Sequence, residues 1–464
     1  VTVIDNNGST LTQDVTVNIA GTNDVPVLIA TDVAGVITEG SALSDAGSIA
    51  FADLDLTDRP TATETTKSVV ATKAGGTELL LTAAQQAAIE NAFTITPSTT
   101  NTNNGTINWN YSITEENLNF LAAGENVTAV FTVTVIDNNG STLTQDVTVN
   151  ITGTNDLPTI TTTGADVTGA VTEDVAVVAA TLTDTGTITF NDLDLTNTHT
   201  VSVTRASGSL LGGTLTLGNV SEDATTTAGS VPWTYTIPTS ATQYLALNQT
   251  ASEVFTVTIS DGNGGTVTQN VTVTATGTND APVINAITTT ALNEQTNTTA
   301  LTTSIPVTFT DVDLTDISHA ASITGVVASG ITTGLALSSS QLRDLVTPVS
   351  VTKTSGSSSG SINMGFSAPA TALDYLAAGE VLTLTYTVGL NDGDGGTTSQ
   401  TFVVNITGTN DTPTITTVTG TDVTGAVIED AYSTTLTNTG TITFDDVDLT
   451  NTHTVSSVSK ASGT

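Results

Sequence analysis

Acidic and amide side chains recur at fixed places in this sequence, and their types and spacing suit the binding of a hard cation. The tetrapeptide Gly-Thr-Asn-Asp occurs four times, and each copy is followed one residue later by a proline. Its last two residues are Asn23 and Asp24, Asn155 and Asp156, Asn279 and Asp280, and Asn410 and Asp411. Calcium accepts both carboxylate and side-chain amide oxygens as ligands. We therefore predict a calcium site at each copy, which we call a junction.

Four further features recur at matching distances from the junctions. The motif Asp-x-Asp-Leu-Thr supplies Asp53 and Asp55, Asp192 and Asp194, Asp311 and Asp313, and Asp446 and Asp448. A glutamate soon after each junction supplies Glu39, Glu173, Glu294 and Glu429. The turn of the hairpin before each junction supplies Asp5, Asp137, Asp261 and Asp392. The sequence Ala-Gly-Glu supplies Glu125 and Glu380, whereas Gln249 stands at the corresponding place between them.

Carboxylates gathered in such numbers would repel one another unless cations lay between them. Two like charges ~4 Å apart cost about 4 kcal/mol at an effective dielectric constant of ~20. About two or three calcium ions per junction would balance the charge, since calcium takes ~6–8 oxygens in a flexible geometry. Magnesium needs a stricter octahedron, and zinc prefers histidine or cysteine. The three histidines, His199, His319 and His453, are expected to pack or to start a strand rather than bind metal.

Strand direction predicts which of these features meet. The first strand of a domain leaves its junction and descends, so the early glutamate lies at the far end. The next strand climbs back and ends in Asp-x-Asp at the near end. The last strand must descend to reach the next junction, so the hairpin turn before it also lies at the near end. Ala-Gly-Glu precedes a rising strand and lies at the far end. Each junction should thus collect two glutamates from the domain before it and three aspartates from the domain after it. For Asn155 and Asp156 the predicted set is Glu39, Glu125, Asp192, Asp194 and Asp261.

Repeats divide the chain into units of the size of one β-sandwich. The junction aspartates are spaced by 132, 124 and 131 residues. Residues 1–24 match residues 133–156 at every position except Ala20, which corresponds to Thr152. We therefore expect 1–24 to be the last hairpin of a preceding repeat and 25–156, 157–280 and 281–411 to be three domains. Residues 412–464 are expected to be the first part of a following repeat, so the sequence reads as a window of a longer array.

Local patterns predict strands almost throughout. Apolar and hydroxyl residues alternate over Phe131–Val135 and Leu143–Ile151, on either side of an Asp-Asn-Asn-Gly turn, which is typical of a hairpin. The same hairpin is expected over Phe255–Ala275 and Tyr386–Ile406. First strands are expected near Val27–Ile29 and Ser48–Phe51. The helical pattern is confined to Leu81–Ala92, with Thr82 as N-cap, and Leu337–Leu345, with Ser338 as N-cap. The predicted fold is all-β: tandem Ig-like or cadherin-like β-sandwiches in an elongated rod.

Composition narrows the possible partners. The chain has 45 acidic and 7 basic residues and a net charge of −38, so nucleic acid and anionic membrane surfaces are not expected partners. Asp outnumbers Glu by 32 to 13, which favours turns and cation ligands over helix surfaces. There is no cysteine, so no disulfide can stabilise the domains. No apolar run approaches the ~18 residues of a membrane span, and no signal peptide is visible, although one could lie elsewhere on a longer chain.

No catalytic constellation stands out. The three histidines are equivalent by repeat, which argues against a Ser-His-acid set, and no glycine-rich phosphate loop with a lysine is present. Paired carboxylates that could hydrolyse a glycoside recur at every junction, where a substrate cleft is not expected. Lys–Asn cross-links cannot be general, because residues 157–280 contain no lysine. Trp109 and Trp233 each lie in a Trp-x-Tyr strand pattern and are expected in the core rather than in a glycan site. We do not expect an enzyme.

The sequence resembles the VCBS and cadherin-like repeats of very large, RTX-adhesin-like bacterial surface proteins. The resemblance lies in Asp-x-Asp-Leu, in Leu-Ala-Ala-Gly-Glu at Leu121–Glu125 and Leu376–Glu380, in Asp-Gly-Asn-Gly-Gly at 261–265 and in Gly-Thr-Asn-Asp-Ala-Pro at 277–282. It covers nearly the whole chain and implies sandwiches joined by calcium-bound linkers and exported by type I secretion. The order of ligands is similar to that of animal cadherins. Gln249 departs from it, which leaves full occupancy of the Asn279–Asp280 junction open.

These observations predict a non-catalytic, extracellular or cell-surface segment of bacterial origin that extends a large adhesin and is stiffened by calcium, with roles in cell adhesion and biofilm. Its expected partners are the neighbouring repeats of the same chain and, in a filament or biofilm matrix, other copies. The alternative is a structural subunit of an extracellular filament or sheath that assembles through strand edges of different chains. The adhesive target and the ends of the parent chain are not predicted.

Overall fold

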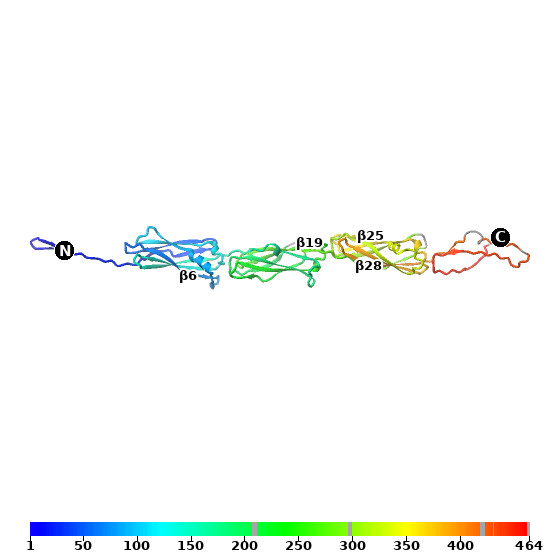
Figure 1. Ribbon diagram of the computed structural model, residues 1–464, viewed down its shortest axis with the longest axis horizontal. Coiled ribbons are helices and arrows are strands. Elements are labelled where there is room, and N and C mark those ends of the chain that lie inside the picture. The colour runs from blue at the N-terminus through cyan, green and yellow to red at the C-terminus, as the bar shows by residue number, and fades with distance from the viewer. Residues whose placement is uncertain (207–210, 296–298, 418–422, 430, 462–464) are drawn as a thin grey trace.

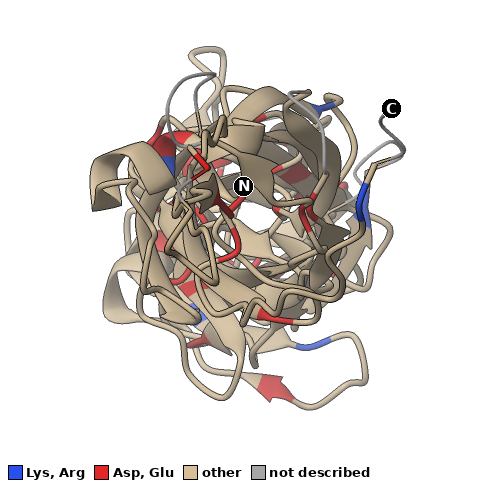
Figure 2. Ribbon diagram, turned by 90° about the vertical axis from the view of Figure 1, so that its right-hand side faces the viewer, with Lys and Arg blue, Asp and Glu red and all other residues tan. Residues whose placement is uncertain are grey.

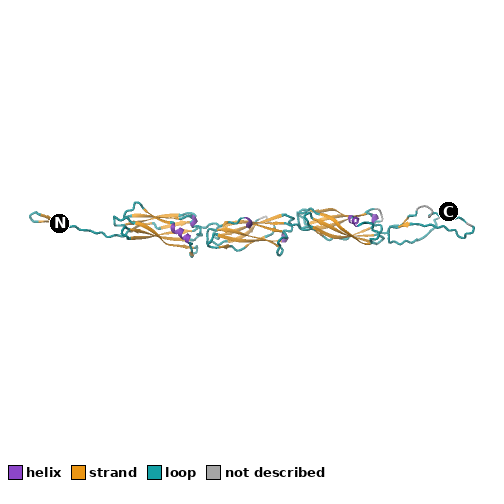
Figure 3. Ribbon diagram, in the orientation of Figure 1, coloured by secondary structure: helices purple, strands orange, loops and turns teal. Residues whose placement is uncertain are grey.

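The computed structural model describes residues 1–206, 211–295, 299–417, 423–429 and 431–461. Within them the chain forms three two-sheet β-sandwiches that follow one another along an elongated rod (Figure 1). Strands run along each sandwich and loops gather at its two ends (Figure 3). We call residues 25–156, 157–280 and 281–411 repeats one, two and three. The predicted all-β fold of tandem sandwiches is confirmed.

Repeat one contains a four-stranded and a five-stranded sheet. The first has the order β3 (Val27–Thr31), β5 (Ser44–Ala52), β9 (Gly105–Ser112) and β8 (Phe93–Pro97). The second has the order β4 (Ala34–Thr38), β11 (Thr142–Thr152), β10 (Asn126–Ile136), β6 (Thr61–Thr72) and β7 (Glu78–Leu79). Helix α1 (Ala83–Asn91) and the 3₁₀ turn η1 (Glu115–Asn117) lie in the connections. All strand pairs are antiparallel except β4 with β11.

Repeats two and three have the same plan. In repeat two, one sheet has the order β12 (Thr159–Ile160), β14 (Thr181–Asn191), β18 (Ala228–Pro238) and β16 (Thr214–Leu217), and β17 (Ser221–Glu222) also pairs with β18. The other sheet has the order β13 (Thr168–Thr172), β20 (Thr266–Thr276), β19 (Thr250–Ser260) and β15 (Thr200–Arg205). In repeat three, one sheet has the order β21 (Val283–Ile284), β23 (Leu301–Thr310), β26 (Ser359–Ala368) and β25 (Val346–Lys353). The other has the order β22 (Thr290–Asn293), β28 (Thr397–Thr407), β27 (Val381–Asn391) and β24 (Ala320–Gly330). The remaining elements are η2 (Gly164–Val167), η3 (Thr239–Ala241), α2 (Ser339–Asp344), η4 (Ala370–Ala372), β1 (Thr2–Ile4), β2 (Thr10–Thr12), β29 (Thr414–Ile415) and β30 (Phe444–Asp445).

Alternation of apolar and hydroxyl residues builds the cores. Along β10, every second residue from Val127 to Val135 is buried, and the threonines between them face the other side of the sheet. Each repeat has its own core cluster. Trp109 and Trp233 are almost fully buried, as predicted, and their indole N–H groups donate to the backbone oxygens of Asp32 and Asp166.

The two predicted helices are confirmed, together with their caps. Thr82 begins α1, and its hydroxyl accepts from the Gln85 backbone N–H while the Gln85 side chain accepts from the Thr82 N–H. Ser338 and Gln341 make the same reciprocal pair at α2. Each pair satisfies donors that a helix start would leave free, which explains why such short helices form. None of the described helices is long and apolar enough to cross a membrane.

Candidate cation sites at the junctions

The early glutamate of each repeat reaches the junction because one strand pair is parallel. Strands β4 and β11 pair as far as Thr38 and Thr152, so the next residue of the first strand, Glu39, leaves the sheet beside the Gly-Thr-Asn-Asp motif. The Thr154 backbone N–H then donates to Glu39 Oε2 at 2.8 Å. The corresponding bonds in the next two repeats run from Thr278 to Glu173 at 3.0 Å and from Thr409 to Glu294 at 3.0 Å.

The Asp-x-Asp motif of the following repeat meets each junction from the other side. Its second aspartate accepts a hydrogen bond from the backbone N–H of the junction aspartate. The four bonds are Asp24 to Asp55 at 2.8 Å, Asp156 to Asp194 at 2.9 Å, Asp280 to Asp313 at 2.9 Å, and Asp411 to Asp448 at 3.0 Å. The first aspartate fixes the loop, since its Oδ1 accepts the N–H of the second, as Asp192 does from Asp194 at 2.9 Å.

The hairpin aspartate holds the junction asparagine. The side-chain Nδ2 of the asparagine donates to Oδ2 of the aspartate, while Oδ1 of the aspartate accepts backbone N–H groups of its own turn. The three contacts are Asn23 to Asp137 at 2.8 Å, Asn155 to Asp261 at 2.9 Å, and Asn279 to Asp392 at 3.0 Å. In Asn155 and Asn279 the donor end of the amide is held by the hairpin and the acceptor end is left for another partner, whereas Asn23 Oδ1 accepts from Asn139 Nδ2.

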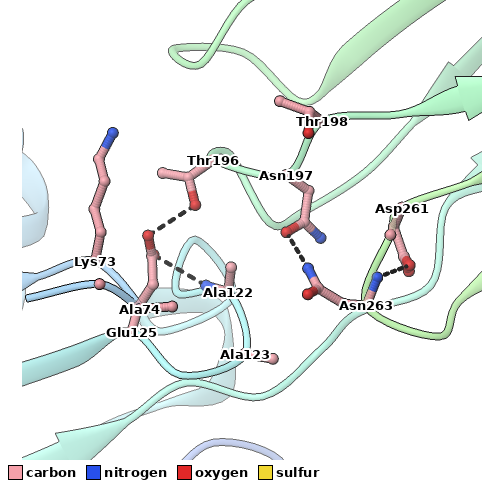
Figure 4. Close-up of a pocket in the computed structure, with 12 residues that line it drawn as sticks. Lys73, Ala74, Ala122, Ala123, Glu125, Thr196, Asn197, Thr198, Asp261 and Asn263 are labelled. Atoms are coloured by element: carbon pink, nitrogen blue, oxygen red, sulfur yellow. Dashed lines mark hydrogen bonds between the residues drawn. The ribbon is translucent and has the colours of Figure 1, made fainter.

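The late glutamate links two repeats through a hydroxyl group. Thr196, the last residue of Asp-x-Asp-Leu-Thr in repeat two, donates to Glu125 Oε1 at 2.7 Å, and the Ala122 N–H donates to Oε2 at 3.1 Å (Figure 4). Thr450 donates to Glu380 at 2.9 Å in the same way. Gln249, where the sequence lacks a glutamate, accepts from Thr315 at 2.9 Å with its amide oxygen. The change to glutamine therefore removes a charge but keeps the contact between repeats.

The structure thus gathers most of the predicted residues. The first junction brings Asp53, Asp55 and Asp137 to Asn23 and Asp24. The second brings Glu39, Glu125, Asp192, Asp194 and Asp261 to Asn155 and Asp156. The third has Glu173, Asp311, Asp313 and Asp392 with Asn279 and Asp280, and the fourth has Glu294, Glu380, Asp446 and Asp448 with Asn410 and Asp411. Glu429 is exposed, and Asp5 bonds only within its own hairpin among the described contacts.

Several carboxylate and amide oxygens at the junctions are buried without a hydrogen-bond partner among the described residues, four at the second junction and three at each of the third and fourth. At the second junction these are Glu39 Oε1, Asn155 Oδ1, Asp156 Oδ2 and Asp194 Oδ1. At the third they are Asn279 Oδ1, Asp280 Oδ2 and Asp313 Oδ1, and at the fourth Glu294 Oε1, Asp411 Oδ2 and Asp448 Oδ1. In Glu39 and Asp194 the other oxygen accepts the bond that positions the side chain. Buried acceptors of this kind require a partner, and these come from both repeats.

Burial and mutual repulsion raise the pKa values of these acids. Burial, followed by the charges of Asp156 and other acids, raises the pKa of Glu39 to about 7. Burial, and then the charges of Asp192 and Asp156, raise the pKa of Asp194 to about 7. For the same first cause the pKa values rise to about 7 at Glu173 and Glu294 and to about 6 at Asp313. The protein alone therefore does not compensate the charge at its junctions.

These donors fit calcium. The unpartnered junction atoms are carboxylate and amide oxygens together with the Thr409 hydroxyl, and a hard cation with a flexible coordination shell accepts such oxygens. Each imidazole is already paired with the first aspartate of its Asp-x-Asp motif: His199 Nε2 lies 2.8 Å from Asp192 Oδ2, His319 Nε2 2.6 Å from Asp311 Oδ2, and His453 Nε2 2.6 Å from Asp446 Oδ2. His199 Nδ1 also lies 2.7 Å from Glu222 Oε2. The rings also pack on Phe190, Phe309 and Phe444. The histidines therefore pack, as predicted, and His199 and His319 directly precede β15 and β24.

Sequence reasoning missed several junction residues. The charge of Glu115 raises the pKa values of Glu39 and Asp156, that of Asp174 acts on Glu173 and Asp280, and that of Asp374 acts on Glu294 and Asp411. These three acids stand at different places in their repeats, so no recurrence marks them. The threonine of Asp-x-Asp-Leu-Thr, in contrast, recurs in every copy and could have been recognised as a junction residue.

The threonine bridge gives a direct test of the contact between repeats. Changing Thr196→Val removes the hydroxyl and leaves Glu125 Oε1 without its donor, so we expect the joined repeats to lose about 1–3 kcal/mol of stability toward denaturant. The control is Thr183→Val, at an exposed position of β14 that contacts no junction. Equal effects of the two substitutions on the unfolding midpoint would contradict a role for the bridge.

Fold and site together define a class: tandem β-sandwiches whose junctions gather acidic side chains from two successive repeats. Neither a model of a known protein family nor a curated protein sequence matches this chain. The solved structures that it is similar to include the protocadherin GammaB4 extracellular domain, at 13% identity and a TM-score of 0.39, over 93% of this chain and 57% of that one. It is also similar to mouse cadherin-23 EC22-24, at 14% identity and a TM-score of 0.37, over 83% of this chain and 99% of that one. Drosophila N-cadherin EC1-4 is similar at 15% identity and a TM-score of 0.31, over 84% of this chain and 76% of that one. The chain thus spans a little over half the length of the protocadherin GammaB4 structure.

Proposed function

We propose that this chain is an extracellular spacer whose repeats are locked end to end by calcium, as part of a large bacterial cell-surface adhesin. The observation that carries the proposal is the set of buried, unpartnered oxygens at the junctions. Those oxygens belong to both repeats, Glu39 to the repeat before the second junction and Asp194 to the repeat after it. An ion bound by both would couple the two domains.

The charge distribution supports this function. The chain has 45 acidic residues and only 7 basic ones, and acidic segments far outnumber basic ones in the view along the rod (Figure 2). At the second junction the open hollow between the repeats contains Glu125 and Asp261, and Lys73 is its one basic lining residue (Figure 4). Lys73 makes no described ion pair. A divalent cation is therefore the natural counter-charge, and the extracellular space supplies calcium at concentrations that suit weak sites. The bacterial surface and type I export rest on the sequence resemblance alone.

Calcium binding should stabilise the domains as well as join them. A ligand that binds only the folded state at 1,000 times its Kd adds about 4 kcal/mol per site. We therefore expect saturating calcium to raise the Tm of the chain by ~10 °C or more, since 1 kcal/mol shifts a domain of this size by a few degrees. Differential scanning calorimetry in calcium and in chelator measures this shift.

A single neutralised ligand makes the test specific. Asp194→Asn keeps the hydrogen-bonding shape but removes one charge and weakens a ligand at the second junction, so the calcium-induced rise in Tm should shrink. Asp166→Asn, at an exposed residue of the same repeat outside both junctions, should keep the full rise. If wild type shows no rise, or if both variants lose it equally, the proposed function is wrong.

A further inference from the structure

Beside the first junction, repeat one contains a buried cluster of three carboxylates, Asp53 and Asp137 of the junction together with Asp58, and no other such cluster is found among the described residues. Asp53, Asp58 and Asp137 each offer a carboxylate oxygen, and the three oxygens lie within 4.8 Å of one another. The residues are only 4%, 4% and 5% exposed. Asp53 Oδ2 and Asp58 Oδ2 have no hydrogen-bond partner among the described residues. Two buried, unpaired carboxylate oxygens beside a third carboxylate are unfavourable unless a proton or a cation neutralises their charge.

Among the described residues, no basic side chain pairs with a carboxylate of this cluster. The nearest basic residue in sequence is Arg59, and its guanidinium donates to the backbone oxygens of Leu56, at 3.1 Å, and Asp58, at 2.5 Å, rather than to a carboxylate. No described ion pair involves any of the three aspartates.

In the other repeats a histidine occupies the corresponding place. The residue equivalent to Asp53 is Asp192, Asp311 or Asp446, and in each case its Oδ2 lies 2.6–2.8 Å from a histidine Nε2. The histidine follows the first aspartate by seven or eight residues, where repeat one has Pro60 and Thr61. The oxygen that is unpaired in Asp53 is thus satisfied within the protein elsewhere.

The residue at the place of Asp58, or its surroundings, also differs in the repeats that have the histidine. It is Asn197 in repeat two and Asn451 in the last segment, and both amides donate to the second aspartate of their motif, at 3.0 and 2.8 Å. In repeat three it is Asp316, whose carboxylate groups with Asp311 and His319. There Lys353 Nζ also donates to the backbone oxygen of Asp316 at 2.6 Å. Asp316 Oδ2 is unpartnered as well, but Asp311 Oδ2 is paired with His319. Among the described residues, only repeat one leaves both aspartates with an unpaired oxygen and has neither histidine nor lysine beside them.

We propose that Asp53, Asp58 and Asp137 bind one further divalent cation of the calcium type, and that a histidine side chain takes the place of that ion in the other repeats. The inference rests on the proposed calcium binding and extends it, because it assigns different numbers of ions to different repeats. Three carboxylates and no nitrogen or sulfur ligand suit calcium. The replacement also explains why Asp53 Oδ2 is unpaired in repeat one, which lacks the histidine, whereas the corresponding oxygens of Asp192, Asp311 and Asp446 are paired with one.

The test compares two aspartates at the same place in their repeats. Asp58→Asn and Asp316→Asn each remove one buried carboxylate beside an Asp-x-Asp motif, but only the first lies in the proposed site. Calcium bound per full chain at saturation, measured by equilibrium dialysis, should fall by one ion in Asp58→Asn and stay unchanged in Asp316→Asn. Equal counts in wild type and Asp58→Asn, or equal losses in both variants, overturn the inference while leaving the junction sites intact. A wild-type chain that binds no calcium overturns the proposed function with it.

The reverse variant tests the replacement by histidine. His319→Ala frees Asp311 Oδ2 beside Asp316 and leaves only Lys353, which bonds backbone oxygens there, as a difference from repeat one, so the chain should gain one ion at saturation. As a readout of folding, Asp58→Asn should melt at a higher temperature than wild type in chelator, because it relieves repulsion within the cluster. No gain of an ion in a folded His319→Ala chain, or a lower melting temperature of Asp58→Asn in chelator, contradicts the inference.

Discussion

In chelator this chain should be shorter and softer than in calcium. With the ions removed, each junction keeps only a few hydrogen bonds between repeats, such as Thr196 to Glu125 and Asp156 to Asp194 at the second. The carboxylates of each junction, six of them at the second, then repel one another. Free hinges make a row of rigid units behave as a flexible chain, whose end-to-end distance scales with the square root of the number of units. We expect the maximum dimension to fall by roughly a third to a half on that scaling.

Small-angle X-ray scattering measures the change directly. The chain is compared in millimolar calcium, in chelator and in chelator with magnesium, all at ~0.15 M salt so that repulsion beyond ~8 Å is screened. Magnesium should restore the rod poorly, because the junction oxygens do not impose an octahedron. Dimensions that stay the same in all three conditions would refute a calcium-locked rod. Growth of the particle with protein concentration would favour the filament-forming alternative instead.

Acid should stabilise the calcium-free chain and destabilise the calcium-bound one. The pKa values of Glu39, Glu173, Glu294 and Asp194 are raised to about 7 in the folded chain without metal, from ordinary values near 4. A carboxyl whose folded pKa is raised contributes stability that is fully present below its unfolded pKa. That stability is lost as the pH rises through the folded pKa. Each such group therefore changes stability by about 1.4 kcal/mol per pH unit between pH ~4.5 and ~7.

Bound calcium should reverse the sign of this dependence of stability on pH. Bound calcium requires the deprotonated carboxylates, so protons compete with it and its stabilisation falls as the pH drops below ~7. Melting curves at pH 5, 6, 7 and 8 should thus rise toward acid in chelator and fall toward acid in calcium. The double variant Glu39→Gln with Asp194→Asn should flatten both slopes. Slopes of the same sign in calcium and in chelator would show that these acids do not hold the ion.

Much of the fold could be predicted because the sequence repeats its own signals. Thr82 and Ser338 predicted the start of each helix, since a cap and its glutamine partner lie within one turn. Alternation in Phe131–Val135 predicted a half-buried strand without knowledge of its neighbours. For the junctions, strand direction predicted that Glu39 and Asp194 would approach Asn155 and Asp156 from opposite sides, and the structure places them there.

The finer arrangement of the junctions depends on contacts that recurrence does not record. Glu115 and Asp374 reach their junctions from places that hold other residue types in the neighbouring repeats. In the sequence, Gln249 indicated the loss of a junction carboxylate, yet its amide oxygen keeps the hydrogen bond to Thr315 of the next repeat. The pairing of His319 with Asp311 also could not be predicted, because the histidine stands at a slightly different distance from the motif in repeat three than in repeat two.

The parallel strand pair in each repeat determines how the chain carries tension. Strands β4 and β11 run in the same direction and exchange bonds over five residue pairs, as do β13 and β20, while β22 and β28 do so over four. A pull on the two ends of the chain draws the first strand of such a pair upward and the last strand downward. The bonds are then sheared together instead of being peeled apart one after another, so each repeat should resist stretching until the whole pair yields at once.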